Sequence, residues 1–205
     1  MILGVLKPSL YALTDWRNRL PRIRPRGLFW SIPACIETML CYAGLDGISQ
    51  EDLVLGYCRN YGEGALLEIV LHAPLRTVPA SIKGLDQQEI IELAKQCTFR
   101  CGNFDTFAEA ARRKLAFKRP PMSLDFIGGI KARADYFAAM TEAVKADCPI
   151  AISVKARNHT LHNLVVLEAD PDKFITYDPE RNTIRRRKVA DCDFSGDALV
   201  LRPDS

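Results

Sequence analysis

The stretch that decides the fold is Trp30-Ser31-Ile32-Pro33-Ala34-Cys35-Ile36-Glu37-Thr38-Met39-Leu40-Cys41-Tyr42. Ser31 is a preferred N-cap residue, Pro33 suits the first turn of a helix, and Gly44 suits the end of one. Apolar residues with helical spacing share one face: Ile36, Met39, Leu40 and Ala43. The stretch therefore predicts a core helix that begins near Ser31 or Pro33 and ends before Gly44.

Two fragments far downstream carry side chains that suit catalysis together with this helix. His162 heads an apolar run typical of a strand, and Asp178 closes the next strand-like run. Two antiparallel strands would bring this imidazole and this carboxylate side by side, facing the helix that carries residue 31. A hydroxyl or thiol nucleophile needs a base and a third group that orients the base. The candidate catalytic residues are therefore Ser31, His162 and Asp178, and a helix N-terminus favours an anion at position 31.

The remaining periodicity divides the chain into a helical part and a strand-rich part. A second helix is expected to start at Ser49, which has Asp52 three residues on, as in a capping box. Further helices are predicted over 87–96, 104–117 and 134–145. Strands are predicted over 150–154, 162–168, 174–177 and 198–201. This order predicts an α+β fold, with an N-terminal helical half packed on a C-terminal antiparallel sheet. The first 27 residues are expected to be extended on the surface, and 61–84 stay ambiguous.

Five segments occur in a fixed order: SIPACIETMLCYAG, ISQEDL, CPIAISV, HNLVVLEAD and FITYDP. In this order they resemble the papain-like cysteine peptidase superfamily, in particular the bacteriocin-processing (double-glycine leader) peptidases and their relatives. In that family the helix reads Cys-Gly-Pro-Ala-Cys or Cys-x-x-Ala, a histidine precedes a valine-rich strand, and Asp-Pro closes the following strand. The resemblance covers 31–54 and 148–180. It implies a single papain-like domain over 1–205, with the nucleophile-helix region at 31–54, helical elaboration at 60–145 and a sheet carrying His and Asp at 148–202.

Carried over position by position, the family's nucleophile falls on Ser31, its base on His162 and its orienting acid on Asp178. Two departures follow. The nucleophile position holds serine instead of cysteine, and the family's oxyanion-hole glutamine falls near Pro25 and Arg26, where no glutamine stands. Backbone N–H groups at the helix start, aided by Arg26 or Trp30, are the expected oxyanion or substrate-binding groups.

Each of these residues also has a simpler explanation. N-capping alone accounts for a serine at position 31, and an aspartate before a proline often starts a turn. Cys35 is the nearest thiol, but it lies about one turn inside the helix and is expected to face the core. His159 rivals His162 as the base, and His72 is expected to be structural.

The composition is that of an ordinary soluble globular protein. The chain has 205 residues, of which 48% are hydrophobic and 26% charged, enough for one sizeable core. A net charge of +3 does not indicate nucleic acid, and the basic runs 17–26 and 185–188 are interpreted as solvated surface. No long apolar stretch or signal peptide is evident, so we expect no membrane span and a cytoplasmic location by default, with specialised export left open.

The cysteines give no metal or disulfide signal. All seven are irregularly spaced and no CxxC pair occurs, so neither a disulfide framework nor a zinc site is expected. The papain-type mechanism needs no cofactor, and we expect none. Most of these cysteines are expected to be small buried hydrophobic residues.

Three functions remain for the predicted site. The first is a cysteine peptidase or amide hydrolase acting on a peptide or protein, inactivated because Ser31 is harder to ionise than a thiol. The second is a non-catalytic pseudo-peptidase that binds a peptide or protein partner. The third is a Ser-dependent hydrolase or acyltransferase, which the absence of a GxSxG elbow around Ser31 disfavours. We expect the activity of this chain to be low or absent.

Overall fold

A large antiparallel sheet organises the fold. The computed structural model describes residues 11–67, 82–100, 104–116, 122–128, 133–155, 161–170 and 172–203. The sheet has seven strands: β1 (Tyr11–Ala12), β4 (Met122–Ile127), β5 (Ile150–Lys155), β6 (Leu161–Asp170), β7 (Lys173–Asp178), β8 (Thr183–Lys188) and β9 (Asp193–Pro203). Their order is β4-β9-β5-β6-β7-β8, and β1 pairs with β6. A second sheet pairs β2 (Leu66–Leu67) with β3 (Thr98–Phe99).

All predicted helices are present close to their expected bounds, beside two short helices that were not predicted. Together they are α1 (Trp16–Arg19), α2 (Ser31–Tyr42), α3 (Gln50–Tyr61), α4 (Gln87–Ala94), α5 (Phe104–Leu115), α6 (Arg133–Lys145) and the 3-10 helix η1 (Val189–Asp191). The predicted capping box of α3 is confirmed, because the Ser49 side chain accepts from the Asp52 amide and the Asp52 side chain accepts from the Ser49 amide. At α2 the residue in the N-cap position is Trp30 and not Ser31, and no side chain caps this helix.

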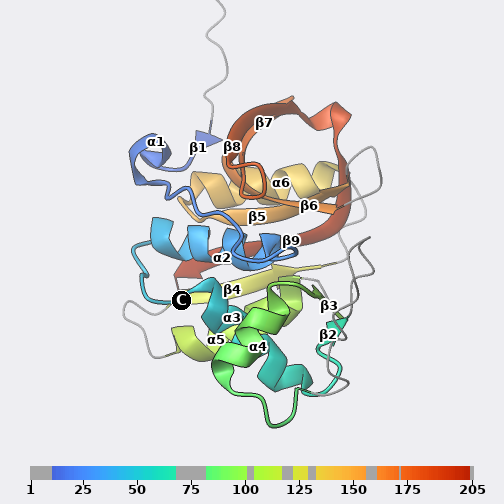
Figure 1. The fold of residues 1–205 in the computed structure, drawn as a ribbon. Helices are drawn as coiled ribbons and strands as arrows, with labels where there is room; N and C mark the ends of the chain where they lie inside the picture. The colour runs from blue at the N-terminus through green and yellow to red at the C-terminus, as the bar shows by residue number, and fades with distance from the viewer. Residues whose placement is uncertain are drawn as a thin grey trace, which may run out of the picture.

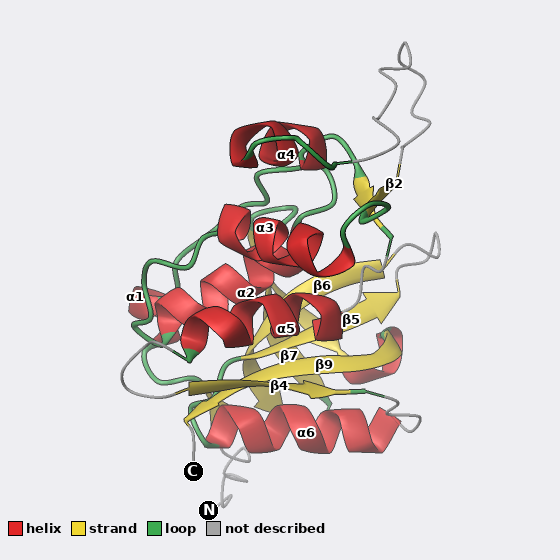
Figure 2. Ribbon diagram, turned by 90° about the horizontal axis from the view of Figure 1, so that it is seen from below, coloured by secondary structure: helices red, strands yellow, loops and turns green. Residues whose placement is uncertain are grey.

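The helices pack on both faces of the sheet (Figures 1 and 2). α2, α3 and α5 lie on one face, and α6 lies on the other. Ring stacking between Tyr136 of α6 and Phe194 of β9, with centroids 4.8 Å apart, fixes the α6 side. The predicted α+β class, with helices packed on an antiparallel sheet, is confirmed.

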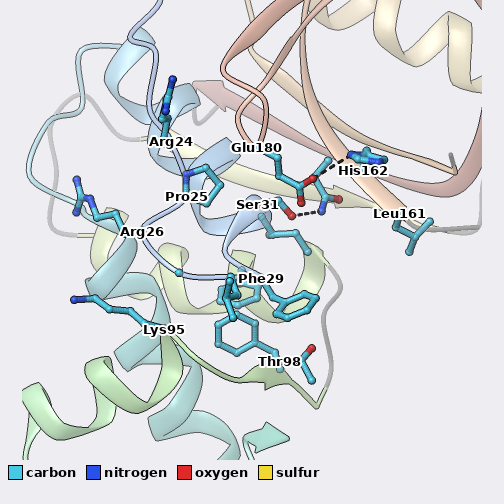
Figure 3. Close-up of a pocket in the computed structure, with 16 residues that line it drawn as sticks. Arg24, Pro25, Arg26, Phe29, Ser31, Lys95, Thr98, Leu161, His162 and Glu180 are labelled. Atoms are coloured by element: carbon cyan, nitrogen blue, oxygen red, sulfur yellow. Dashed lines mark hydrogen bonds and ion pairs between the residues drawn. The ribbon is translucent and has the colours of Figure 1, made fainter. Parts of the chain in front are cut away.

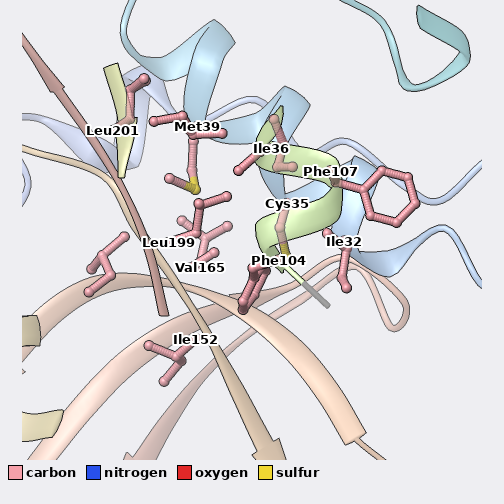
Figure 4. Close-up of a cluster of buried hydrophobic side chains, with 14 of the residues drawn as sticks. Ile32, Cys35, Ile36, Met39, Phe104, Phe107, Ile152, Val165, Leu199 and Leu201 are labelled. Carbon is pink, nitrogen blue, oxygen red and sulfur yellow. The ribbon is translucent and has the colours of Figure 1, made fainter. Parts of the chain in front are cut away.

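α2 is the central core helix. All of its residues except Cys41 are buried. Cys35, Ile36 and Met39 are fully buried with Val165 and Leu199 of the sheet (Figure 4). Burying each such large apolar side chain contributes about 1.5–3 kcal/mol to folding. This packing holds α2 against β6, so the N-terminus of the helix has a fixed position relative to the first residues of that strand.

The structure also corrects several expectations. The first 27 residues contain β1 and α1 and are therefore not wholly extended. The segment 60–145 is not only helical, because β4 pairs with β9 in the main sheet. β8 was not predicted, since its sequence is mostly basic; Arg185, Arg186 and Lys188 are exposed on this edge strand. In the described part of the chain, every helix is too short or too polar to cross a membrane.

Candidate active site

An open cleft of about 910 Å³ lies where the N-terminus of α2 meets the first residues of β6 (Figure 3). One wall is the segment before α2, which we call the strap (residues 22–30). The opposite wall, which we call the strand wall, consists of Leu161, His162, Asn163 and Glu180. Ser31 lies between the two walls and lines the cleft together with His162. Two of the three predicted catalytic residues therefore share one cleft.

Ser31 is the first residue of α2 and is 7% exposed. Its Oγ accepts a hydrogen bond of 2.8 Å from Nδ2 of Asn163. Within the described residues this bond, and not N-capping or a bond to His162, is the interaction of the Ser31 hydroxyl. The first N–H groups of a helix have no partner inside the helix, and the helix dipole adds partial positive charge there. The surroundings of Ser31 therefore favour negative charge.

Asn163 is held in turn by Ser153. The two residues are direct neighbours in the antiparallel pairing of β5 with β6. Ser153 Oγ donates to Asn163 Oδ1 at 2.6 Å, and both side chains are buried. The sequence analysis did not select Asn163, since an asparagine in a strand carries no catalytic signature by itself.

His162 is paired with a carboxylate that the sequence analysis missed. Its Nδ1 lies 3.1 Å from Oε2 of Glu180, in the turn after β7. Asp178 is close by, because ligand-type atoms of His162, Asp178 and Glu180 all lie within 4.8 Å of one another. The only available signal for Glu180 was a second carboxylate two residues after Asp178. His162 and Asp178 are thus neighbours, and the contact of 3.1 Å with the ring is made by Glu180.

Asp178 lies behind the cleft and is 1% exposed. Its Oδ1 accepts from the Arg181 amide at 3.2 Å, and its Oδ2 lies 3.7 Å from the Arg187 guanidinium. Three possible ligand groups also raise the question of a metal. Arg187 and Arg181 already place positive charge beside Asp178, and they would repel a cation at this cluster. The cluster therefore suits an imidazole partner better than a metal.

The strap alternates exposed arginines with half-buried residues. Gln50, which is fully buried, fixes it by accepting from the Arg26 amide at 3.0 Å and donating to the Arg24 carbonyl at 2.9 Å. Gln50 also donates to Glu37 of α2 at 2.8 Å. The Tyr177 hydroxyl donates to the Ile23 carbonyl at 2.9 Å. The strap is thus tied to α2, α3 and β7.

The two predicted oxyanion or substrate-binding residues have different environments. Trp30 is fully buried, and its indole N–H donates to the Ala94 carbonyl at 3.0 Å. The predicted contact of Trp30 with substrate is therefore not supported. A Cβ at position 27 would lie 2.5 Å from the Trp30 ring, so any residue larger than glycine would clash with the indole there. Arg26 lines the cleft, but its guanidinium is paired with Glu37 at 3.0 Å and with Glu51.

The rival residues are less suited to the chemistry. Cys35 is fully buried in the core, as predicted, and burial, followed by the charges of Asp178 and Glu180, raises the pKa of its thiol well above the usual value. A thiol that resists ionisation is a poor nucleophile. His72 and His159 lie outside the described residues, so the choice between His159 and His162 stays a prediction.

Comparisons with known proteins bear on the fold. Neither a scan of protein-family models nor a search of curated proteins finds a match. The crystal structure of a putative C39-like peptidase from Bacillus anthracis is similar, with a TM-score of 0.53 and 14% sequence identity, over 96% of this chain and 99% of that chain. The fold is that of the papain-like peptidases. The peptidase domain of Streptococcus ComA, a bi-functional ABC transporter involved in quorum sensing, is also matched, with a TM-score of 0.43 and 15% identity, over 96% of this chain and 98% of that one.

Proposed function

We propose that the chain is a papain-like peptidase or amide hydrolase in an inactivated form, with a peptide or protein segment bound in the cleft. Position 31 is the nucleophile position, His162 is the base, and Asp178 and Glu180 supply the negative charge that orients the base. The observation that carries the proposal is that Ser31 opens α2 inside the same cleft as His162, whose ring is paired with Glu180 at 3.1 Å.

The serine accounts for the expected low activity. In a papain-type site, histidine removes the proton of a thiol whose pKa is easily lowered to a similar range. A hydroxyl in the same place ionises far less readily, and its shorter bond to carbon withdraws the reacting atom from the substrate. Binding does not depend on this difference. The chain is therefore expected to hold peptides and to cleave them slowly or not at all.

A peptide ligand is supported by the apolar side chains at the mouth of the cleft. Leu28 and Phe29 of the strap are 58% and 44% exposed, and Leu161 of the strand wall is 55% exposed. In the described part of the chain, Tyr61 is the one other exposed large hydrophobic residue. Exposed apolar groups that gather around a concave site are typical of a binding surface. This clustering favours recognition of an extended segment with apolar side chains.

A second candidate function is binding without any cleavage, which the serine at the nucleophile position favours. A natural pseudo-peptidase needs this cleft but no nucleophile. A working serine hydrolase or acyltransferase is the remaining alternative. It requires labelling of Ser31 by a fluorophosphonate, and this labelling must be lost on His162→Ala.

The main test restores the thiol. In Ser31→Cys, the alkylation rate at position 31 by iodoacetamide at pH 7 is measured by peptide mapping. Thr98→Cys is the matched control, because Thr98 of β3 lines the same cleft but lies at the far end from His162 in Figure 3. We expect about tenfold or faster reaction at position 31 than at position 98. Adding His162→Ala is expected to remove the difference. Equal alkylation rates in the two single variants would contradict the proposal.

A peptide library then separates the hydrolase from the pseudo-peptidase. Ser31→Cys, the wild-type chain and Ser31→Ala are incubated with the same library, and products are identified by mass spectrometry. Cleavage by Ser31→Cys alone supports an inactivated hydrolase. Peptide retention by all three chains without new termini supports the pseudo-peptidase.

A further inference from the structure

The cleft lacks the side-chain donor that its fold relatives would be expected to use. No glutamine stands near Pro25, and the Arg26 guanidinium is engaged by Glu37 and Glu51. Trp30 directs its N–H away from the cleft, to the Ala94 carbonyl. Neither Arg26 nor Trp30 thus offers a side-chain donor at position 31.

The Asn163 amide, in contrast, is a donor that contacts the side chain at position 31 directly. Its Nδ2 lies 2.8 Å from Ser31 Oγ, and Figure 3 shows this bond beside the separate His162–Glu180 pair. We propose that Asn163 is a catalytic residue of this site, whose amide N–H stabilises negative charge on the side-chain atom at position 31. The inference rests on the proposed function, because it takes position 31 as the nucleophile.

Ser153 fixes the amide in the orientation that this role needs. It donates to Asn163 Oδ1 at 2.6 Å, so the NH₂ group is turned towards Ser31. An anion at position 31 can only accept hydrogen bonds, and it therefore favours the same orientation. The cross-strand pairing of Ser153 with Asn163 places donor and support in one rigid part of the sheet.

Burial strengthens the hydrogen bond from Asn163 to position 31. Ser31, Ser153 and Asn163 are each 6–7% exposed, so water competes little for these bonds. Hydrogen bonds to a charged group are stronger than those between neutral groups, and a low local dielectric strengthens them further. The N-terminus of α2 acts on the same atom in the same direction.

The experiment measures the pKa of the thiol in Ser31→Cys from the pH dependence of its alkylation by iodoacetamide. Asn163→Leu in this background removes the donor at similar volume. We expect the pKa of the thiol at position 31 to rise by about one to two pH units, because a hydrogen bond to a charged group is lost. At a pH below both pKa values the alkylation rate falls by about tenfold for each unit of this rise. An unchanged pKa in this variant would overturn the inference.

Two further variants keep the test decisive if Asn163→Leu folds poorly. Asn163→Asp preserves the shape but adds a like charge, so the thiol pKa is expected to rise at least as much as with leucine. Ser153→Ala frees the amide to rotate, and a smaller rise is expected. Because the added charge raises the pKa by itself, Ser153→Ala is the variant that decides: a purely structural Asn163 would leave the thiol pKa unchanged there, as judged on samples with matched circular dichroism spectra.

The outcomes separate this inference from the proposed function. If the thiol at position 31 reacts no faster than the one in Thr98→Cys, both fail. If it reacts fast and depends on His162, but is insensitive to Asn163 and Ser153, the proposed function stands and the role of Asn163 is rejected. If the reactivity depends on His162, Asn163 and Ser153, both the proposed function and the role of Asn163 are supported.

Discussion

The two walls of the cleft are built differently. Gln50 bonds the strap backbone at Arg26 and Arg24, Tyr177 bonds it at Ile23, and the buried Trp30 indole adds a side-chain anchor. The strand wall instead carries polar side chains that make side-chain contacts. His162 is paired with Glu180, and Asn163 holds Ser31.

We therefore expect the strap to determine the shape of the cleft and the strand wall to determine its reactivity. The strap bonds use backbone carbonyl and amide groups, so they are insensitive to which residue stands at position 31. The strand-wall contacts involve position 31 and His162, the proposed nucleophile position and base. Under the proposed function, a serine at position 31 changes the reactivity while the strap, α2 and the apolar mouth of the cleft keep their form. Substitutions in the strap anchors should therefore affect stability, and those in the strand wall should affect reactivity.

The largest expected effect comes from Trp30→Ala, which removes the indole on which the strap is packed. The side chain is fully buried and its N–H is bonded to the Ala94 carbonyl. We expect a loss of about 3–5 kcal/mol in the free energy of unfolding, measured by urea denaturation. Leu28→Ala, at an exposed strap position, is the control and should change stability by less than about 0.5 kcal/mol. Similar losses in both variants would show that Trp30 is not an anchor.

Gln50→Leu should have the next largest effect. It leaves the Arg26 amide and the Arg24 carbonyl without their bonds, and removes one partner of the buried Glu37 carboxylate. We expect a loss of about 2–3 kcal/mol, because unsatisfied buried polar groups are costly. Gln88→Leu on the exposed surface of α4 serves as the control and should be nearly neutral. A neutral Gln50→Leu would contradict the strap network.

Tyr177 links the strap to the sheet and gives a pH-dependent test. Burial is the main cause that raises the pKa of Tyr177 from 10.0 to about 12. The unfolded chain therefore loses this proton first, so the contribution is complete below about pH 10 and is lost as the pH rises through 12. We expect the wild-type chain to lose about 1–2 kcal/mol more stability over this window than Tyr177→Phe. Parallel pH profiles would contradict this, and Tyr61→Phe, an exposed position, should match the wild type.

Local signals explain why the helices could be predicted from the sequence. The start of α3 follows from its capping box, and α2 follows from its apolar spacing; both signals lie within about one turn of the residues concerned. The α+β class follows from the order of such segments. β8 escaped prediction because an edge strand can be almost wholly basic, with its pairing supplied by β7.

The site was only partly predictable, because its key contacts join distant residues. Position 31 and His162 were found through motif order, and the cleft brings them together. Asn163 and Glu180 were missed, since their roles depend on the register of β5 with β6 and on the turn after β7. A register shift between β6 and β7 near Val166 also alters which residues face one another. Such features are decided by tertiary packing and carry no local sequence signal.

The smallest expected effect is that of Glu180→Gln, which tests the strand wall without affecting the strap. In the Ser31→Cys background this change removes the negative charge 3.1 Å from Nδ1 of His162. The thiolate–imidazolium pair should be less stable, so alkylation at position 31 should slow by about two- to fivefold, as for a partly exposed ion pair. Urea denaturation should change little. Glu109→Gln, which breaks an exposed pair with Arg113 on α5, is the matched control. If the rate is unchanged by Glu180→Gln but falls in Asp178→Asn, the buried aspartate orients the base alone.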